Sequence, residues 1–207
     1  MAGERVRIEI MLTLIGTGKT VLDIGCYDGQ ISALIKDRGN TVYGVDISES
    51  AVDMARQRGI EAKVGDLDHG LPFSSDSFDV VLASEVIEHV LNVDLLMEEA
   101  NRVLRNTGFA VLTTPNLASL GRRLLLLMGK NPLVETRWTE GSAGHVRYFV
   151  KDTLVDLLRH HNFTMEQFCS DVVNFDNSGR QLSTRLAGWF PTFGRSLIVK
   201  AAKAQPS

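Results

Sequence analysis

Residues 20–30 constrain the fold of this chain more than any other stretch. An apolar run through Ile24 ends at Gly25, and Gly29 precedes a segment whose apolar residues recur at helical spacing. Glycine leaves the backbone open to close approach, and the first N–H groups of a helix point back toward the preceding turn. The pattern predicts a strand, a glycine turn and a helix that together cradle a nucleotide or a nucleoside.

The glycine spacing narrows the kind of ligand. Gly25 and Gly29 form a Gly-x-x-x-Gly pattern, which differs from the Gly-x-Gly-x-x-Gly of dinucleotide-binding proteins. This spacing disfavours a nicotinamide-dependent oxidoreductase. No Gly-Lys-Ser/Thr follows the strand, so the turn is not the phosphate loop of a nucleoside triphosphatase. The similar run at residues 16–20 precedes the strand and is interpreted as an ordinary loop.

A carboxylate follows the next apolar run at the distance expected for ribose binding. Residues 41–46 form a predicted second strand that ends in Asp46. It lies about 20 residues beyond the glycine turn, where a carboxylate can accept hydrogen bonds from both ribose hydroxyls. The alternative is that Asp46 only caps the turn before Ser48.

Four motifs, in this order, resemble those of the class I S-adenosylmethionine-dependent methyltransferases. They are Val-Leu-Asp-Ile-Gly-Cys at 21–26, Gly-Val-Asp-Ile-Ser at 44–48, Gly-Asp-Leu at 65–67 and Phe-Asp-Val-Val at 78–81. The match covers residues 20–114, with weaker similarity toward the C-terminus. The resemblance implies S-adenosylmethionine as the cofactor. It also implies a Rossmann-like α/β fold, a doubly wound and mostly parallel seven-stranded sheet with an antiparallel last strand.

The resemblance further implies which residues bind the cofactor. Asp23 and the glycine turn would hold the methionine end, Asp46 the ribose, and Asp66 the adenine amino group, with apolar neighbours on the ring. Many members have glycine where this chain has Tyr27, whose side chain narrows the turn. We therefore expect Tyr27 to border the pocket, outside the core. The full expected set is Asp23, Gly25, Cys26, Tyr27, Gly29, Asp46, Ile47, Asp66, Leu67 and Ser84.

The composition agrees with one globular domain in a reducing compartment. A chain of 207 residues can bury a sizeable core. Two cysteines are too few for a disulfide framework, which favours a cytoplasmic location. The net charge of −3 provides no electrostatic footprint for nucleic acid. No run has the length of a membrane span or the apolar core of a signal peptide.

The rest of the chain alternates between strand-like and helix-like segments, as in a doubly wound sheet. Ser48 is the expected N-cap of a helix that Gly59 ends. The segment 78–83 is almost continuously apolar, as expected for a strand covered on both faces. The predicted helices are 49–58, 93–104 and 151–160, and the further strands are 62–64, 78–83, 109–114, 164–173 and 196–201.

The fourth strand leads into Ser84-Glu85-Val86-Ile87-Glu88-His89. If a helical turn starts there, Glu85, Glu88 and His89 share one face at the mouth of the cofactor site. Two carboxylates and an imidazole suit a divalent ion such as Mg²⁺, Mn²⁺ or Zn²⁺. The motif resembles the ubiquinone-biosynthesis O-methyltransferases and the 3′-terminal 2′-O-methyltransferases of small RNAs. In the RNA enzymes, Glu-x-x-Glu-His and a later histidine bind a metal, which implies His145 here.

The same residues have an interpretation without metal. Many methyltransferases of this class carry Glu-His after the fourth strand with no ion, and the pair lines the acceptor pocket. Catalysis would then rest on His89 and Glu88, with His89 as general base, because imidazole titrates near neutral pH. Thr114-Pro115-Asn116 after the fifth strand also matches the two branches.

A long insertion, residues 117–144, separates the fifth strand from His145. Its leucines and a methionine recur at helical spacing, flanked by arginines and a lysine. The pattern favours either a helix that packs on the core or a lid over the acceptor. A helix that contacts a membrane is the less favoured interpretation. An aromatic run at 188–193 adds apolar surface near the C-terminus.

These features predict one methyltransferase domain over residues 1–207. It would move the sulfonium methyl to a hydroxyl of a small-molecule or lipid-linked acceptor. A methyltransferase acting on the 2′-hydroxyl of RNA or a sugar is an alternative, although the charge does not favour nucleic acid. Another is a non-catalytic S-adenosylmethionine-binding module, motivated by Tyr27 and by residues 1–18, which offer only a short helix over the substrate. The oligomeric state stays open.

Overall fold

The computed structural model describes residues 2–132, 144–175 and 182–204. The strands of the main sheet are β1 Thr20–Ile24, β2 Thr41–Asp46, β3 Glu61–Val64, β4 Phe78–Ser84, β5 Leu104–Pro115, β6 Phe163–Cys169 and β9 Ser196–Lys203. A separate pair consists of β7 Val173–Asn174 and β8 Leu182–Ser183. The helices are α1 Ala2–Ile15, α2 Gln30–Asp37, α3 Glu49–Gln57, α4 Val93–Val103, α5 Leu120–Leu127, α6 Lys151–His160 and α7 Thr184–Trp189, with short 3₁₀ turns η1 Leu67–His69 and η2 Pro191–Phe193.

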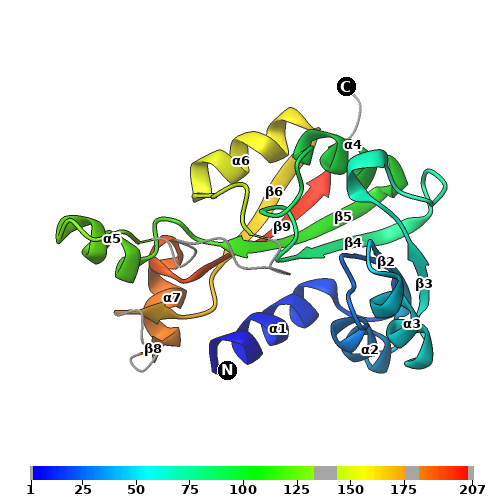
Figure 1. The fold of residues 1–207 in the computed structure, drawn as a ribbon, viewed down its shortest axis with the longest axis horizontal. Coiled ribbons are helices and arrows are strands. Elements are labelled where there is room, and N and C mark those ends of the chain that lie inside the picture. Colours follow the sequence, from blue (N-terminus) through cyan, green and yellow to red (C-terminus); the bar gives the residue numbers. More distant parts are fainter. Residues whose placement is uncertain (1, 133–143, 176–181, 205–207) are drawn as a thin grey trace.

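The main sheet has the strand order β3-β2-β1-β4-β5-β9-β6 (Figure 1). β1 to β5 are parallel, and β9 is antiparallel to both of its neighbours. The expected seven-stranded sheet with an antiparallel last strand is therefore confirmed. The chain builds outward from β1 to β3 and then restarts on the other side at β4. This places the topological switch point, where ligands bind in such sheets, between β1 and β4.

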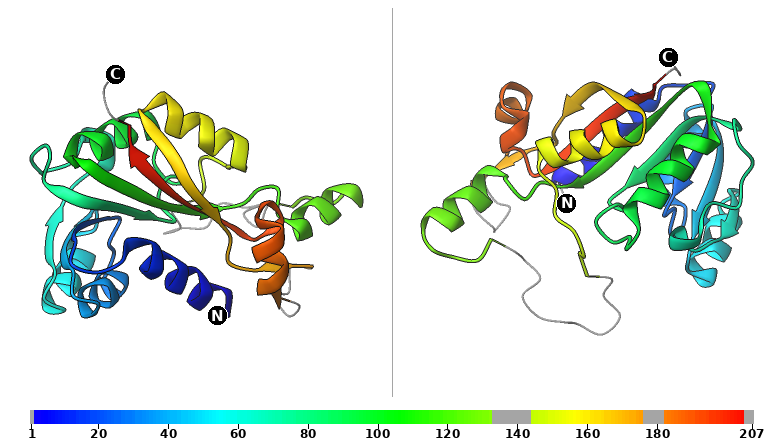
Figure 2. Two further views of the ribbon diagram at one scale, coloured as in Figure 1. Left: turned by 180° about the vertical axis from the view of Figure 1, so that it is seen from behind. Right: turned by 90° about the horizontal axis from the view of Figure 1, so that it is seen from above.

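Two apolar cores lie on the two faces of the sheet. Side chains alternate along a strand, so Val80 and Leu82 of β4 pack with α1, α2 and α3, whereas Val81 and Ala83 pack with α4 and α6. Figures 1 and 2 show these two helical layers on opposite sides of the sheet. The expectation that β4 is covered on both faces is confirmed.

Several element ends differ from the prediction. β5 begins at Leu104 instead of residue 109, because Leu104 pairs with Phe78 before an irregularity in the register. The predicted strand 164–173 is wrong at its end, since β6 stops at Cys169 and Val173 belongs to β7. Between them the buried Asp171 carboxylate accepts the Ser196 N–H at 3.0 Å, which turns the chain away from the sheet.

The first helix is longer than the sequence suggested. α1 has 14 residues, and Met11, Leu12 and Ile15 near its end are buried against the sheet. Its first half reaches the carboxyl ends of the central strands, where Glu4 and Ile8 line a cleft. A helix that covers this side of the sheet is therefore present. This removes one of the two observations that supported the alternative of a non-catalytic S-adenosylmethionine-binding module.

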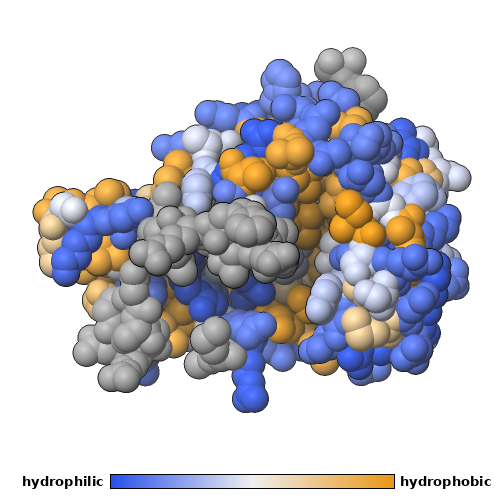
Figure 3. Space-filling view, in the orientation of Figure 1, coloured by the Kyte–Doolittle hydropathy of each residue, from blue (hydrophilic) through white to orange (hydrophobic). Residues whose placement is uncertain are grey.

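The leucines in the described part of the insertion, residues 117–132, do not belong to the apolar core. α5 extends beyond the end of the sheet in every ribbon view, and hydrophobic atoms gather on it in Figure 3. Leu127 is 84% exposed, so the prediction of a core-packed helix is wrong. The Leu117 N–H donates to the Phe149 carbonyl at 2.9 Å, joining the two ends of the insertion. Residues 133–143 lie outside the described residues. No described helix has the length and hydropathy needed to cross a bilayer.

Candidate functional site

A cleft of about 370 Å³ opens at the switch point of the sheet. The β1–α2 turn forms its floor, the end of β4 forms one wall, and α1 forms another. Its lining includes five expected cofactor residues, namely Asp23, Gly25, Cys26, Tyr27 and Ser84. Five of the residues that the family resemblance implied for the cofactor therefore line one cavity.

The turn between β1 and α2 is left-handed at Gly25, Tyr27 and Gly29, with φ of 69°, 47° and 78°. A Cβ at Gly25 would lie 2.6 Å from a Val86 methyl, and one at Gly29 would lie 2.9 Å from Ala55 of α3. Both glycines are thus required by the backbone and by packing. Protein atoms occupy the space that a Cβ would need at both positions, and Gly25 also lines the cleft, so the approach of a ligand to its backbone stays a prediction.

Tyr27 occupies the position where glycine is common in the family that the sequence resembles. Its left-handed φ explains that preference, since a side chain is strained there. The tyrosine is 63% exposed and lines the cleft, so the expectation that it stays outside the core is confirmed.

Tyr27→Gly should change cofactor affinity without changing stability. Relief of the left-handed strain and the added freedom of the unfolded chain are each about 1 kcal/mol and offset one another. The Kd for S-adenosylmethionine should shift by roughly 3-fold or more, because the ring borders the pocket. Calorimetry and thermal unfolding check the two parts. Tyr27→Ala is the control, since it keeps the strain and removes the ring; a large loss of stability with unaltered binding in Tyr27→Gly would make Tyr27 structural.

Asp23 lies at the floor of the cleft, with 3% of its surface exposed. Ser32 of α2 donates to its carboxylate at 2.5 Å. Burial raises the pKa of Asp23 to about 7, although the serine hydrogen bond opposes the shift. A cationic ligand in the cleft would stabilise the charged form of a carboxylate this deeply buried.

Asp46 holds the turn from the neighbouring strand. One carboxylate oxygen accepts the Tyr27 N–H and the other accepts the Ser48 N–H, both at 2.9 Å. The capping role proposed from the sequence is therefore confirmed, and each oxygen keeps a second lone pair for a ligand. The next residue, Ile47, is 67% exposed.

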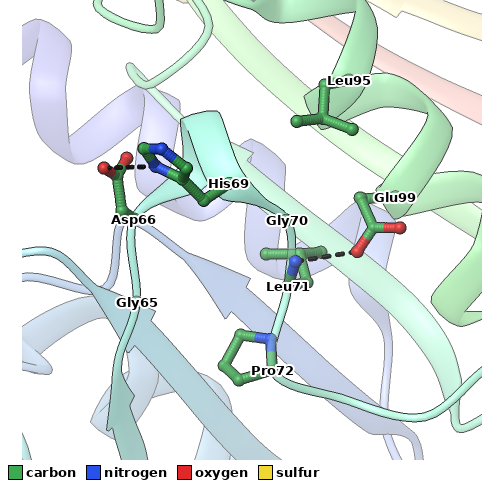
Figure 4. A pocket seen from close by; sticks show the side chains of 8 residues that line it. All are labelled: Gly65, Asp66, His69, Gly70, Leu71, Pro72, Leu95 and Glu99. Carbon is green, nitrogen blue, oxygen red and sulfur yellow. Dashed lines mark hydrogen bonds and ion pairs between the residues drawn. The ribbon is translucent and has the colours of Figure 1, made fainter.

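Of the residues expected at the adenine, Asp66 lines a second pocket of about 380 Å³ (Figure 4), whereas Ile47 and Leu67 are not among its lining residues. Asp66 stands on one side, where its carboxylate pairs with the His69 ring at 2.8 Å. The hydrogen bond from the Asp68 N–H holds the pKa of Asp66 below its usual value. Glu99 stands opposite and accepts the Leu71 N–H. Leu67 is half-buried against the core.

The segment after β4 does not form the expected helical turn. Glu85 has a left-handed φ of 58°, and its N–H bonds to the Thr113 carbonyl of β5. Its carboxylate accepts from the Thr113 hydroxyl at 3.0 Å and pairs with Arg7 of α1 at 2.7 Å. Glu85 is therefore turned toward the cleft and α1, and the prediction that it shares a helical face with Glu88 and His89 is wrong.

Glu88, His89 and His145 converge beside this cleft. One ligand atom from each lies within 4.8 Å of the others, and the two imidazole rings are 4.7 Å apart. Glu88 is 1% exposed, and the Thr114 hydroxyl donates to one of its oxygens at 2.9 Å. The other oxygen has no hydrogen-bond partner among the described residues and lies 4.0 Å from His145 Nε2.

The environment of Glu88 keeps its proton near neutral pH. Burial, followed by the charge of Glu85, raises the pKa of Glu88 to about 7. Its main-chain carbonyl accepts the N–H groups of Val146 and Arg147 at 2.9 and 3.2 Å, and the Arg147 guanidinium donates to the Leu91 carbonyl. The segment that carries His145 is thereby fastened to the turn that carries Glu88.

Sequence reasoning missed the residues that hold this site in place. Arg7, Glu4 and Ile8 come from α1, which has no motif that marks them. Thr113 and Thr114 hold the two glutamates across the β4–β5 register. Thr114 stands in the motif after the fifth strand, but only the strand pairing reveals its partner.

The sequence profile of a family described as "Methyltransferase domain" matches residues 5–168. The chain belongs to the S-adenosylmethionine-dependent methyltransferases. The bifunctional methionine biosynthesis protein MetXA/MetW of Rhodopirellula baltica is 37% identical over an alignment of 120 positions that covers 53% of this chain and 19% of that protein. A ubiquinone biosynthesis O-methyltransferase of Agrobacterium fabrum is 35% identical over 127 residues, 58% of this chain and 49% of that protein.

The matched segment thus covers less than half of each of these two relatives. Among solved structures, a putative methyltransferase from Bacillus halodurans has a TM-score of 0.70 at 19% identity, over 96% of this chain and 99% of that chain. This likeness shows the class I methyltransferase fold. In a methyltransferase of this fold, the cleft between β1 and β4 is where the cofactor is expected.

Proposed function

We propose that this methyltransferase moves the sulfonium methyl of S-adenosylmethionine to a hydroxyl oxygen of a small-molecule or lipid-linked acceptor. The observation that carries the proposal is the buried Glu88, with an unpartnered oxygen and a raised pKa, beside two imidazoles at the cofactor cleft. A hydroxyl needs its proton removed before it attacks, and such a cluster accepts a proton near neutral pH. The relative from Agrobacterium fabrum is named an O-methyltransferase, which agrees with oxygen as the acceptor atom.

The cofactor would lie along the carboxyl ends of β1 and β2. Asp23 would pair with the α-ammonium group of the methionine end, which compensates its burial. Asp46 would use its remaining lone pairs for the ribose hydroxyls. Asp66, at the second pocket, would accept from the adenine amino group.

The chemical step is an in-line displacement. The acceptor oxygen attacks the methyl carbon, the carbon–sulfur bond breaks, and the sulfur leaves as a neutral thioether. The proton of the hydroxyl passes to the free oxygen of Glu88 or to His89. The sulfonium is already a good leaving group, so most of the acceleration comes from holding the two reactants in line.

The same cluster fits a divalent metal. Glu88, His89 and His145 offer one carboxylate oxygen and two imidazole nitrogens, a donor set that suits Zn²⁺ or Mn²⁺ and leaves positions open. A bound ion would lower the pKa of an acceptor hydroxyl. Glu85 is outside this set, because Arg7 and Thr113 hold its carboxylate. The proposed metal site therefore has three protein ligands instead of the four that the sequence predicted.

Asp46→Ala should weaken cofactor binding by roughly 10- to 100-fold, because two hydrogen bonds to a charged acceptor are lost. Calorimetry with S-adenosylmethionine measures the change. Asp53→Ala on α3, an exposed carboxylate paired with Arg56, is the matched control and should bind normally. Unchanged affinity in Asp46→Ala would remove Asp46 from the ribose site.

Methyl transfer from labelled cofactor to a panel of phenols, sugars, lipid intermediates and short RNAs tests the function. Label should appear on a hydroxyl acceptor, with one S-adenosylhomocysteine formed per methyl. Cofactor binding with no turnover on any acceptor would instead support a regulatory module. Full activity in excess chelator would eliminate the metal and leave the methyl transfer assignment intact.

A further inference from the structure

An apolar surface with basic residues extends beyond the sheet at the carboxyl end of β5. It is formed by α5 and by the segment from α7 to η2, and we call it the α5–α7 surface. Leu127 is 84% exposed and Trp189 is 74% exposed. Contiguous exposure of large apolar side chains marks an interaction site. The large exposed apolar side chains of the surface are Leu124, Leu126, Leu127, Met128, Trp189 and Phe190.

The two parts of the surface form one unit. The Arg123 guanidinium of α5 lies over the Phe193 ring of η2, 5.1 Å from its centre, and the Phe190 ring lies 5.9 Å from the same ring. At the base, the buried Asn116 amide donates to the Thr192 and Gly194 carbonyls at 3.0 and 2.8 Å. These contacts therefore hold α5 and the α7–η2 segment, which carry the exposed apolar side chains, in a fixed arrangement.

The charge of this surface is one-sided. Residues 116–132 and 182–194 contain Arg122, Arg123, Lys130 and Arg185 and no Asp or Glu, in a chain whose net charge is −3. Leucines and a tryptophan beside basic side chains suit the headgroup region of an anionic bilayer. Anionic lipids attract each such cation, and the tryptophan ring favours the interface.

A second copy of this chain fits the surface poorly. A two-fold interface places each patch against itself. The exposed Arg123, Lys130 and Arg185 would then face the same residues of the second copy, and the described residues 116–132 and 182–194 contribute no carboxylate between them. We propose that the α5–α7 surface docks on an anionic membrane surface as a peripheral contact.

The contact lies next to the candidate site. α5 follows β5 directly, and β5 carries Thr113 and Thr114, which hold Glu85 and Glu88. Docking therefore holds the end of β5 that carries these two threonines on the membrane side of the domain. The docking itself is independent of methyl transfer; only its use to reach a lipid-linked acceptor rests on the proposed function.

Vesicle sedimentation of the full chain without cofactor tests the docking. The protein should bind vesicles of phosphatidylcholine with phosphatidylglycerol and should bind pure phosphatidylcholine much more weakly. Leu126→Ser with Leu127→Ser should lower the partition coefficient by roughly tenfold or more, since two exposed leucines leave the headgroup boundary. Met54→Ser on α3, another exposed apolar side chain, is the matched control and should bind like the wild type.

Charge reversal tests the electrostatic part. Lys130→Glu with Arg185→Glu should reduce binding to anionic vesicles by on the order of 100-fold or more. Arg56→Glu with Arg159→Glu, both exposed on other helices, should have little effect. In a Trp138→Phe background, the emission of Trp189 should shift to the blue on anionic vesicles.

Several results would overturn the proposal. They are the absence of vesicle binding, equal binding to neutral and anionic vesicles, or undiminished binding of the leucine variant. A dimer in analytical ultracentrifugation that dissociates in the leucine variant would also overturn it, in favour of a second copy. Because vesicle binding is measured without cofactor, its failure is distinguishable from a failure of methyl transfer.

Discussion

Glu88→Gln should lower kcat by about 10²- to 10⁴-fold while the Kd for S-adenosylmethionine stays nearly unchanged. The amide keeps the shape and can still accept the Thr114 hydroxyl, but it cannot take a proton from the acceptor. The loss should therefore fall on the chemical step. Single-turnover kinetics with an identified acceptor measure it.

The pH profile separates a catalytic role from a structural one. Burial raises the pKa of Glu88 to about 7, so wild-type kcat/KM should rise as pH increases through 7 and the carboxylate ionises. In Glu88→Gln, kcat/KM should not show this rise with pH. Glu98→Gln, an exposed glutamate on α4, is the matched control. Metal analysis of the wild type and of Glu88→Gln shows whether the lower kcat of the variant is caused by loss of a bound metal ion. Wild-type kcat in Glu88→Gln would exclude Glu88 from catalysis.

Asp23→Asn should remove the loss of stability that titration of Asp23 causes between about pH 4 and about pH 7, and should weaken cofactor binding. The folded pKa of Asp23 is about 7, above its usual 3.8, so the folded state holds a proton that the unfolded state releases. The wild type should therefore lose stability as pH rises from about 4 to about 7, by on the order of 4 kcal/mol. The variant lacks this titration and should be the more stable protein at pH 8, in chemical unfolding.

The same variant should bind S-adenosylmethionine more weakly by on the order of 10- to 100-fold, because a buried charge opposite the ammonium group is lost. At pH 6, binding to the wild type should release a proton, and binding to the variant should not. Calorimetry in two buffers of different ionisation enthalpy measures this. Asp37→Asn, exposed at the end of α2, should leave both properties unchanged. Equal affinity of Asp23→Asn and wild type would place the methionine end elsewhere.

Local sequence patterns were sufficient for the part of the site built from consecutive residues. The strand, glycine turn and helix around Asp23, and the second strand ending in Asp46, follow from periodicity and turn chemistry over short windows. The left-handed turn places Asp23, Gly25 and Tyr27 in one cleft with little help from distant segments. These features depend on interactions between residues that are close together in the sequence.

Features that depend on distant partners were mispredicted or missed. Glu85 turns away from a helical face because Arg7 and Thr113, from other elements, hold it. The convergence of Glu88 with His145 was suggested only by resemblance, since helix geometry cannot link segments so far apart. The leucines of α5 have the same spacing in a core helix as in an exposed one, so periodicity could not decide between them.

The junction between Leu117 and Phe149 makes the insertion an exchangeable segment of the chain. Leu117 and Phe149 are hydrogen-bonded neighbours, and the Glu88 carbonyl holds the residues just after His145. The chain thus leaves and re-enters the domain at one place. Doubling the length of such an excursion costs only about 0.6 kcal/mol of closure entropy. A segment of different length or sequence can therefore be grafted between the same two anchors without moving the turn that carries Glu88.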